Sequence, residues 1–137
     1  MAVKARVLVR GQGRGPLLRL THPISFWGGV DPSDGRICDP RHPEFGVRIS
    51  GSVLALPGTV GSSSSSAVML ELIREGTAPA AIILAHSDAI LALGVVVAAE
   101  LGMDGPPVVE LAPAALAALQ PGTISVDEDG TVREEAG

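Results

Sequence analysis

A continuous apolar run, "AAIILAH" at positions 80–86, constrains the fold more than any other stretch of the chain. A strand with one wet face alternates apolar and polar residues, whereas an unbroken apolar run is typical of a strand covered on both faces. An apolar helix is predicted to follow at about 88–101, with Asp88 as its N-cap and Gly102 closing it. "PPVVEL" (106–111) then predicts another buried strand. This order indicates a parallel strand–helix–strand layer.

The remaining patterns place shorter elements around that layer. They predict strands at 2–10, 16–20 and 47–57, with a turn at 11–15 and a strand end running into a Gly-Gly turn at 24–31. Residues 32–46 are predicted to form one long ordered loop or a pair of turns. A helix from residue 68 that stops at Gly76, a short helix at 113–119 and a closing hairpin with a "DG" turn at 122–134 complete the prediction. We therefore expect an α/β domain with parallel and antiparallel sheet layers. We expect it to span residues 1–137 as one domain, without an internal repeat.

Composition excludes several classes of function. The aromatic residues are one Trp and two Phe, and the formal charge is −5, so the stacking platforms and basic surfaces of nucleic-acid binders are missing. The longest apolar stretch, 89–99, is shorter than the roughly 20 residues that cross a bilayer. The N-terminal residues lack the pattern of a secretory signal. We expect a cytoplasmic protein that binds neither nucleic acid nor membrane.

The metal-ligating residues are few and scattered. Cys38 is the sole cysteine, and the three histidines, His22, His42 and His86, lack the close pairing of a zinc motif. Any metal must therefore come from elsewhere, and Cys38 is expected to be a small buried hydrophobe.

Two further groups of side chains have alternative interpretations. Trp27 and Phe26 are expected as core or interface anchors. Four charged or ionisable residues lie in or beside the long loop: Arg36, Arg41, His42 and Arg48. They could clamp a phosphate, but solvated loop charges or salt bridges to a partner are the favoured interpretation.

The serine run "GSSSSS" at 61–66 stands between a predicted strand and a predicted helix. Its context argues against a linker, because it would have to separate two domains. One serine can cap the helix, which is worth about 1 kcal/mol, but capping does not explain five serines. The alternative is an anion-binding or catalytic turn, because backbone N–H groups and the positive helix end converge there. Both interpretations remain open on chemistry alone.

Three blocks of the sequence resemble the small subunit of the aconitase X family. They are "PISFWGGVDPSDGRICDPRHPEFG", "ISGSVLALPGTVGSSSSSAVMLELIREGTAPAAIIL" and "DAILALGVVVAAELG", and the similarity covers roughly residues 3–125. Archaeal members of that family are small subunits of phosphomevalonate dehydratase, and bacterial relatives dehydrate hydroxyproline. The resemblance implies the swivelling β/β/α domain of aconitases.

The same resemblance implies site residues and partners. Ser62 would be the catalytic base, while Gly61, Ser63 and Ser64 would contact substrate. Aconitases continue this turn with a carboxylate-binding arginine, where this chain has Ser64. A large subunit would hold the [4Fe-4S] cluster, whose iron would assist departure of the hydroxyl. The implied reaction is dehydration of (R)-5-phosphomevalonate to trans-anhydromevalonate 5-phosphate in the mevalonate pathway, or alternatively dehydration of cis-3-hydroxyproline.

Two rival functions belong to other classes. The segment from Ala85 to Val109 faintly resembles the phosphohistidine domain of phosphotransfer enzymes, which shares the swivelling fold. In that domain the histidine immediately precedes the apolar helix, whereas here Asp88 holds that place. The third possibility is a non-catalytic binding module.

Overall fold

The centre of the fold is a layer of parallel strands made from the apolar runs. The computed structural model describes residues 2–60 and 63–135. Strands β6 (Val53–Leu56), β7 (Ala81–Leu84) and β8 (Val108–Glu110) pair in parallel, and β3 (Gly13–Arg19) adds to β6 in the same direction. Every residue of β6 and β7 is buried, which confirms the prediction of strands covered on both faces.

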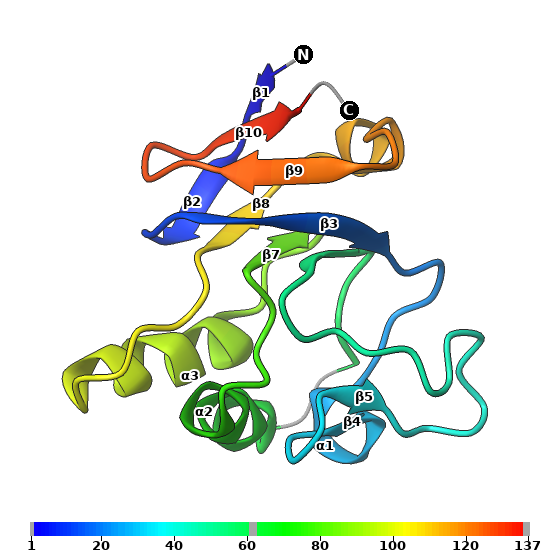
Figure 1. Cartoon of the computed structure of the whole chain (residues 1–137), viewed down its shortest axis with the longest axis vertical. Coiled ribbons are helices and arrows are strands. Elements are labelled where there is room, and N and C mark those ends of the chain that lie inside the picture. Colours follow the sequence, from blue (N-terminus) through cyan, green and yellow to red (C-terminus); the bar gives the residue numbers. More distant parts are fainter. Residues whose placement is uncertain (1, 61–62, 136–137) are drawn as a thin grey trace.

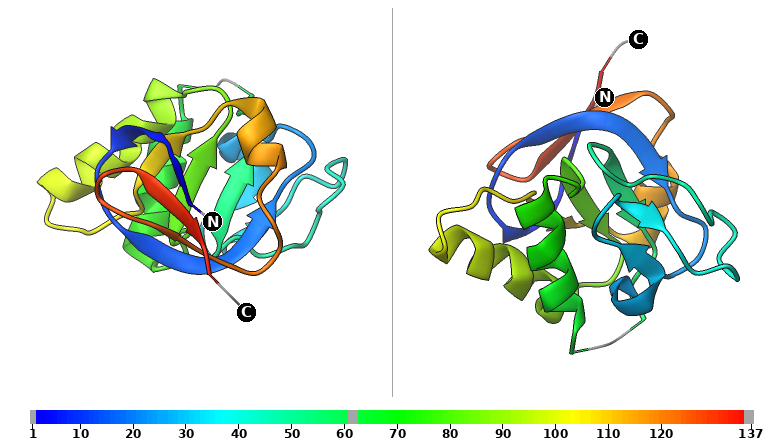
Figure 2. Two further views of the ribbon diagram at one scale, coloured as in Figure 1. Left: turned by 90° about the horizontal axis from the view of Figure 1, so that it is seen from above. Right: turned by 60° about the horizontal axis from the view of Figure 1, so that its bottom comes forward.

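Antiparallel strands complete the main sheet. They are β9 (Thr123–Val126), β10 (Thr131–Glu134), β1 (Ala2–Lys4) and β2 (Arg6–Val9), and the full strand order is β1-β10-β9-β3-β6-β7-β8-β2. Strands β1 and β2 form opposite ends of this order, yet Ala5 alone joins them along the chain, and its N–H bonds the Gly130 carbonyl at 2.8 Å. The N-terminal segment therefore closes the sheet into a barrel, as Figure 2 shows from above, and covers both free edges.

Alternation along the central strands divides the core into two parts. Val53, Ala55, Ala81 and Ile83 belong to a cluster that includes the antiparallel strands. Their neighbours in sequence point the other way and pack with the helices; these are Leu54, Leu56, Ile82 and Leu84. The side-chain period of two in a strand thus fills both the barrel and the helical layer.

Two helices cover the outer face of the parallel layer (Figure 1). Helices α2 (Ser65–Glu75) and α3 (Ala89–Glu100) pack closely against each other because α3 has a glycine at the contact. A Cβ atom on Gly94 would lie 2.5 Å from the Ser66 carbonyl oxygen and 2.9 Å from the Met69 Cβ. The predicted ends hold, since Asp88 caps α3 and Gly76, at φ 75°, ends α2.

The remaining elements are short. Helix α1 (Phe26–Gly29) is one irregular turn, and α4 (Pro113–Ala117) precedes the final hairpin. Strands β4 (Val30–Asp31) and β5 (Arg36–Ile37) form a separate two-stranded sheet. The long loop predicted at 32–46 therefore contains β5. None of the helices in the described ranges is both long and apolar enough to pass through a bilayer.

Three sequence-based boundaries differ from the structure for identifiable reasons. The strand predicted at 2–10 is interrupted at Ala5, where the chain passes from one end of the sheet to the other. The turn predicted at 11–15 is wrong from Gly13 onward, because β3 begins there. A Cβ on Gly13 would collide with the Ala80 carbonyl, so this glycine permits a close approach between backbones. The strand predicted at 47–57 begins only at Val53, since Gly51 adopts a φ of 71°.

Candidate functional site

The serine run connects the carboxyl end of β6 to the amino end of α2. Gly61 and Ser62, predicted as a substrate contact and the catalytic base, lie outside the described residues. Ser63 and Ser64, the other predicted contacts, are exposed, and Ser64 occupies the N-cap position of α2. The described part of the run is therefore placed at the positive end of an 11-residue helix.

The last two serines have different surroundings. The Ser65 side chain is buried, and its hydroxyl has no hydrogen-bond partner among the described residues. The Ser66 hydroxyl donates to the Ser63 carbonyl oxygen at 3.4 Å. The run is thus partly built into the helix, while Ser63 and Ser64 lie at the surface.

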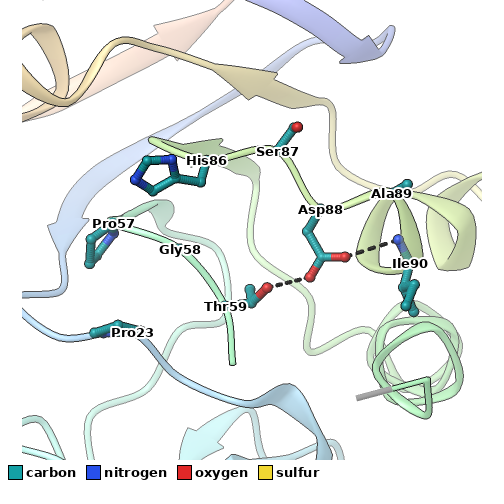
Figure 3. A pocket seen from close by; sticks show the side chains of 9 residues that line it. All are labelled: Pro23, Pro57, Gly58, Thr59, His86, Ser87, Asp88, Ala89 and Ile90. Carbon is teal, nitrogen blue, oxygen red and sulfur yellow. Dashed lines mark hydrogen bonds between the residues drawn. The ribbon is translucent and has the colours of Figure 1, made fainter. Parts of the chain in front are cut away.

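A pocket of about 660 Å³ opens where β6 and β7 end (Figure 3). The two segments that follow these strands form most of its wall, and Pro23 comes from a third segment. Its lining residues are Pro23, Pro57, Gly58, Thr59, His86, Ser87, Asp88, Ala89 and Ile90. Ligand sites in α/β folds commonly lie at the carboxyl ends of the parallel strands, and this pocket has that location.

Asp88 connects the two main walls of the pocket. Its Oδ1 accepts the N–H groups of Ile90 at 2.9 Å and Leu91 at 3.0 Å, which caps α3. Its Oδ2 accepts a hydrogen bond from the Thr59 hydroxyl, as the dashed line in Figure 3 shows. The chain leading from β6 into the serine run is therefore attached to the amino end of α3.

A second connection holds the same segment from the opposite side. The Val60 N–H donates to the Ile24 carbonyl at 3.1 Å, and Ile24 forms a parallel bridge with Thr59. The segment that leads into the "SFWGG" block is thereby fixed beside Thr59 and Val60, the residues that precede the serine run. Its two aromatic residues differ, because Phe26 is fully buried in the core whereas Trp27 is 61% exposed.

Sequence reasoning identified Asp88 as a helix cap but did not place it in a pocket with Thr59 and His86. The order of the strands could have indicated it, because Thr59 follows β6, Asp88 follows β7, and these two strands are parallel neighbours. His86 is exposed and lines the pocket. Asp88 stands at the start of α3, where a phosphohistidine domain would need its histidine. The structure therefore gives the phosphocarrier alternative no additional support.

The cationic side chains of the long loop bind within that loop. Arg36 donates to the Gly46 carbonyl at 3.1 Å, and the Arg48 Nε donates to the Asp34 carbonyl at 3.0 Å. Arg41 pairs with Asp39 at 3.4 Å. None of these arginines lines the pocket described above. These contacts favour the structural interpretation over a phosphate clamp.

Cys38 is exposed, so the expectation of a buried hydrophobe is wrong. Partial burial of the sulfur and the nearby Asp31 carboxylate raise the pKa of its thiol. Among the residues that the structure describes, no three His, Cys, Asp or Glu side chains converge as metal ligands. A [4Fe-4S] cluster takes cysteine thiolates as ligands, and a lone exposed thiol does not fit that requirement.

Comparison with known proteins shows one family. The model of the aconitase X swivel domain matches residues 2–133. The phosphomevalonate dehydratase small subunit of Methanothermobacter thermautotrophicus is 46% identical over 106 residues, which are 77% of this chain and 81% of that protein. The crystal structure of Thermococcus kodakaraensis aconitase X in its holo form superposes with a TM-score of 0.85 at 30% identity, covering 97% of each chain.

A second kind of relative carries the same region within a longer chain. The cis-3-hydroxy-L-proline dehydratase of Pseudomonas aeruginosa is 51% identical over 96 residues. This match covers 70% of the present chain but only 17% of that protein. The domain therefore occurs both as a chain of its own and as a small part of a larger polypeptide.

Proposed function

This chain belongs to the aconitase X swivel-domain family, and we propose that it is the small subunit of a phosphomevalonate dehydratase, a hydro-lyase. The observation that carries this proposal is its 46% identity to an archaeal subunit of that name, over most of both chains. A cis-3-hydroxyproline dehydratase subunit is the second candidate. It is favoured by the 51% identity to the Pseudomonas aeruginosa enzyme, although that enzyme is a much longer chain.

We assign the proton acceptor to Ser62. Its place in the sequence is three residues before α2 begins, and the described neighbours Ser63 and Ser64 are exposed at the amino end of that helix. A serine acts as a base only if its oxygen anion is stabilised. Helix dipoles and converging backbone N–H groups stabilise an anion without a histidine partner. Gly61, Ser63 and Ser64 would hold the substrate through backbone and hydroxyl groups.

The proposed reaction needs one base and one leaving group. Ser62 takes the proton from the carbon next to the carboxylate, and the electron pair left behind forms the carbon–carbon double bond. The bond between the neighbouring carbon and its hydroxyl breaks, and the hydroxyl leaves as hydroxide, which takes a proton from solvent to become water. Ser62 returns its own proton to solvent, so the net products are the alkene and one water. The product is trans-anhydromevalonate 5-phosphate.

The chain cannot complete this chemistry from the side chains that the structure describes, since these offer no carboxylate-binding arginine at the pocket and no cluster ligands. The relatives named small subunits imply a large subunit. We place the iron–sulfur cluster of the family and the remaining substrate contacts on that partner.

Co-expression with the aconitase X large subunit of the same organism tests the proposal. The purified complex should convert (R)-5-phosphomevalonate and release one equivalent of water as the alkene forms, detected by absorbance and mass. Parallel assays with cis-3-hydroxyproline distinguish the two candidates. A cluster-loaded complex that dehydrates neither substrate would contradict both.

A further inference from the structure

The outward side of α3 is apolar along its whole length. Its exposed aliphatic side chains form what we call the apolar ridge: Ile90 (39% exposed), Leu93 (50%), Val96 (46%), Val97 (36%) and Leu101 (63%), the last just beyond the helix. Glu100 is the only charged residue in this helix. The opposite side already packs in the core through Leu91 and Val95. A helix that is apolar on all sides is normally buried on all sides.

Helix α2 shows what a solvent-facing side looks like in the same layer. Its exposed turn carries Glu71, Arg74 and Glu75, and Arg74 pairs with both carboxylates. The two helices pack side by side on one face of the sheet (Figure 1). Only α3 presents an aliphatic surface, so the difference is specific to this helix and does not reflect the helical layer as a whole.

The apolar ridge is continuous with the candidate site. Ile90 lines the pocket at the carboxyl ends of β6 and β7. A groove of about 320 Å³ lies next to that pocket, and Ser87 and Ala89 belong to both. Leu93 and Val96 of the ridge form the groove wall together with residues of β2. The surface therefore extends without interruption from the pocket onto the outer side of α3.

We propose that the apolar ridge is the docking surface for the large subunit, which would contribute an aliphatic patch of its own. This inference rests on the proposed function, in which the base on this chain acts only in a complex with the large subunit. A partner seated there also meets Ile90 and the adjoining groove. A contiguous group of exposed apolar side chains often marks a protein interaction site.

The relatives also favour the large subunit over a second copy. In the Pseudomonas aeruginosa protein the matched segment is 17% of one chain, so the domain there is covalently attached to a much larger body. A larger body can cover the pocket and α3 together. The experiment below also distinguishes the alternative in which two copies of this chain associate through the ridge.

The test is a competition for limiting large subunit. Wild-type chain and a Leu93→Lys variant, carrying different tags, are co-expressed with the large subunit, and their ratio in the purified complex is divided by their ratio in the soluble extract. We expect the variant to be depleted at least about 10-fold, since a buried charge replaces a central apolar contact. Phe45→Lys is the matched control. Phe45 is 58% exposed on the long loop, which Figures 1 and 2 show across the molecule from α3.

The outcomes separate the two proposals. Equal incorporation of Leu93→Lys and wild type, or equal depletion of Leu93→Lys and Phe45→Lys, overturns the docking surface. Co-purification of two differently tagged wild-type chains without the large subunit, abolished by Leu93→Lys, also overturns it in favour of a second copy. If Leu93→Lys is insoluble, Leu93→Gln takes its place with the same expectation. A wild-type complex that forms but dehydrates neither substrate contradicts the proposed function and leaves the docking surface intact.

Discussion

The Thr59 hydroxyl donates a hydrogen bond to Oδ2 of Asp88, and this bond joins two segments that are 29 residues apart in the sequence. The other oxygen of the same carboxylate caps α3. One aspartate therefore fixes the start of a helix and also holds the segment that leads into the serine run. The Thr59–Asp88 pair therefore positions the chain immediately before the serines.

Thr59→Val should loosen the segment before the serine run while keeping the shape of the side chain. We expect the free energy of unfolding to fall by about 1 kcal/mol, because one hydrogen bond is lost and an Asp88 oxygen loses a partner. Turnover by the assembled enzyme should fall several-fold. Chemical denaturation and steady-state kinetics measure the two effects. Thr123→Val in β9, remote from the pocket, is the control, and equal losses in both variants would contradict this role for Thr59.

Ser65→Ala should leave stability unchanged or raise it by up to about 1 kcal/mol. The Ser65 hydroxyl is buried without a partner among the described residues, so its removal eliminates an unpaired polar group. Alanine is also the better helix former. Thermal or urea unfolding of the variant provides the measurement. A loss of more than about 1 kcal/mol would mean that the hydroxyl makes an important contact, against this account.

Gly94→Ala should force α3 away from α2. The added methyl would lie 2.5 Å from the carbonyl oxygen of Ser66, the last residue of the serine run, which lies in the first turn of α2. We expect a destabilisation of about 1–3 kcal/mol despite the better helix propensity of alanine, because overpacking outweighs it. Ala99→Ser, on an exposed position of the same helix, should change stability by less than about 1 kcal/mol. A Gly94→Ala variant as stable as wild type would refute the close contact.

Asp129 should titrate with a pKa of about 2, below its ordinary value of 3.8, chiefly because the Thr131 N–H donates to its carboxylate. A lowered pKa means that the native state favours the charged carboxylate, so its contribution to stability is complete above pH 4 and is lost toward pH 2. NMR titration of this carboxyl group gives the value. Lys4→Met should leave most of the shift, because Lys4, at 3.4 Å, is a lesser cause. A pKa near 3.8 in the wild type would contradict the turn geometry.

The sequence predicts the parts of this fold that depend on local patterns. The run at 80–86 required a doubly covered strand, and Asp88 and Gly76 marked helix ends through capping chemistry that involves only near neighbours. Gly13 misled prediction because a glycine needed for a turn and one needed for a close backbone contact look identical in sequence. The Ala80 carbonyl that decides between them is 67 residues away.

The candidate site was likewise predictable only in part from the sequence. The serine run stood out in the sequence because capping could not explain five serines. The pairing of Thr59 with Asp88 could not be predicted without the register of β6 against β7, which brings their following segments together. Phe26 and Trp27 are adjacent, yet one is buried and the other exposed, since the irregular turn of α1 directs them differently.

The central claim, that Ser62 is the base, is tested most directly by Ser62→Ala in the complex with its cluster-loaded large subunit. Turnover of (R)-5-phosphomevalonate should fall by about 10²–10⁴-fold, the usual contribution of a general base, while subunit assembly and cluster content stay unchanged. Ser65→Ala, three residues along the same run, should retain wild-type turnover as the matched control. Wild-type turnover by Ser62→Ala would contradict the account.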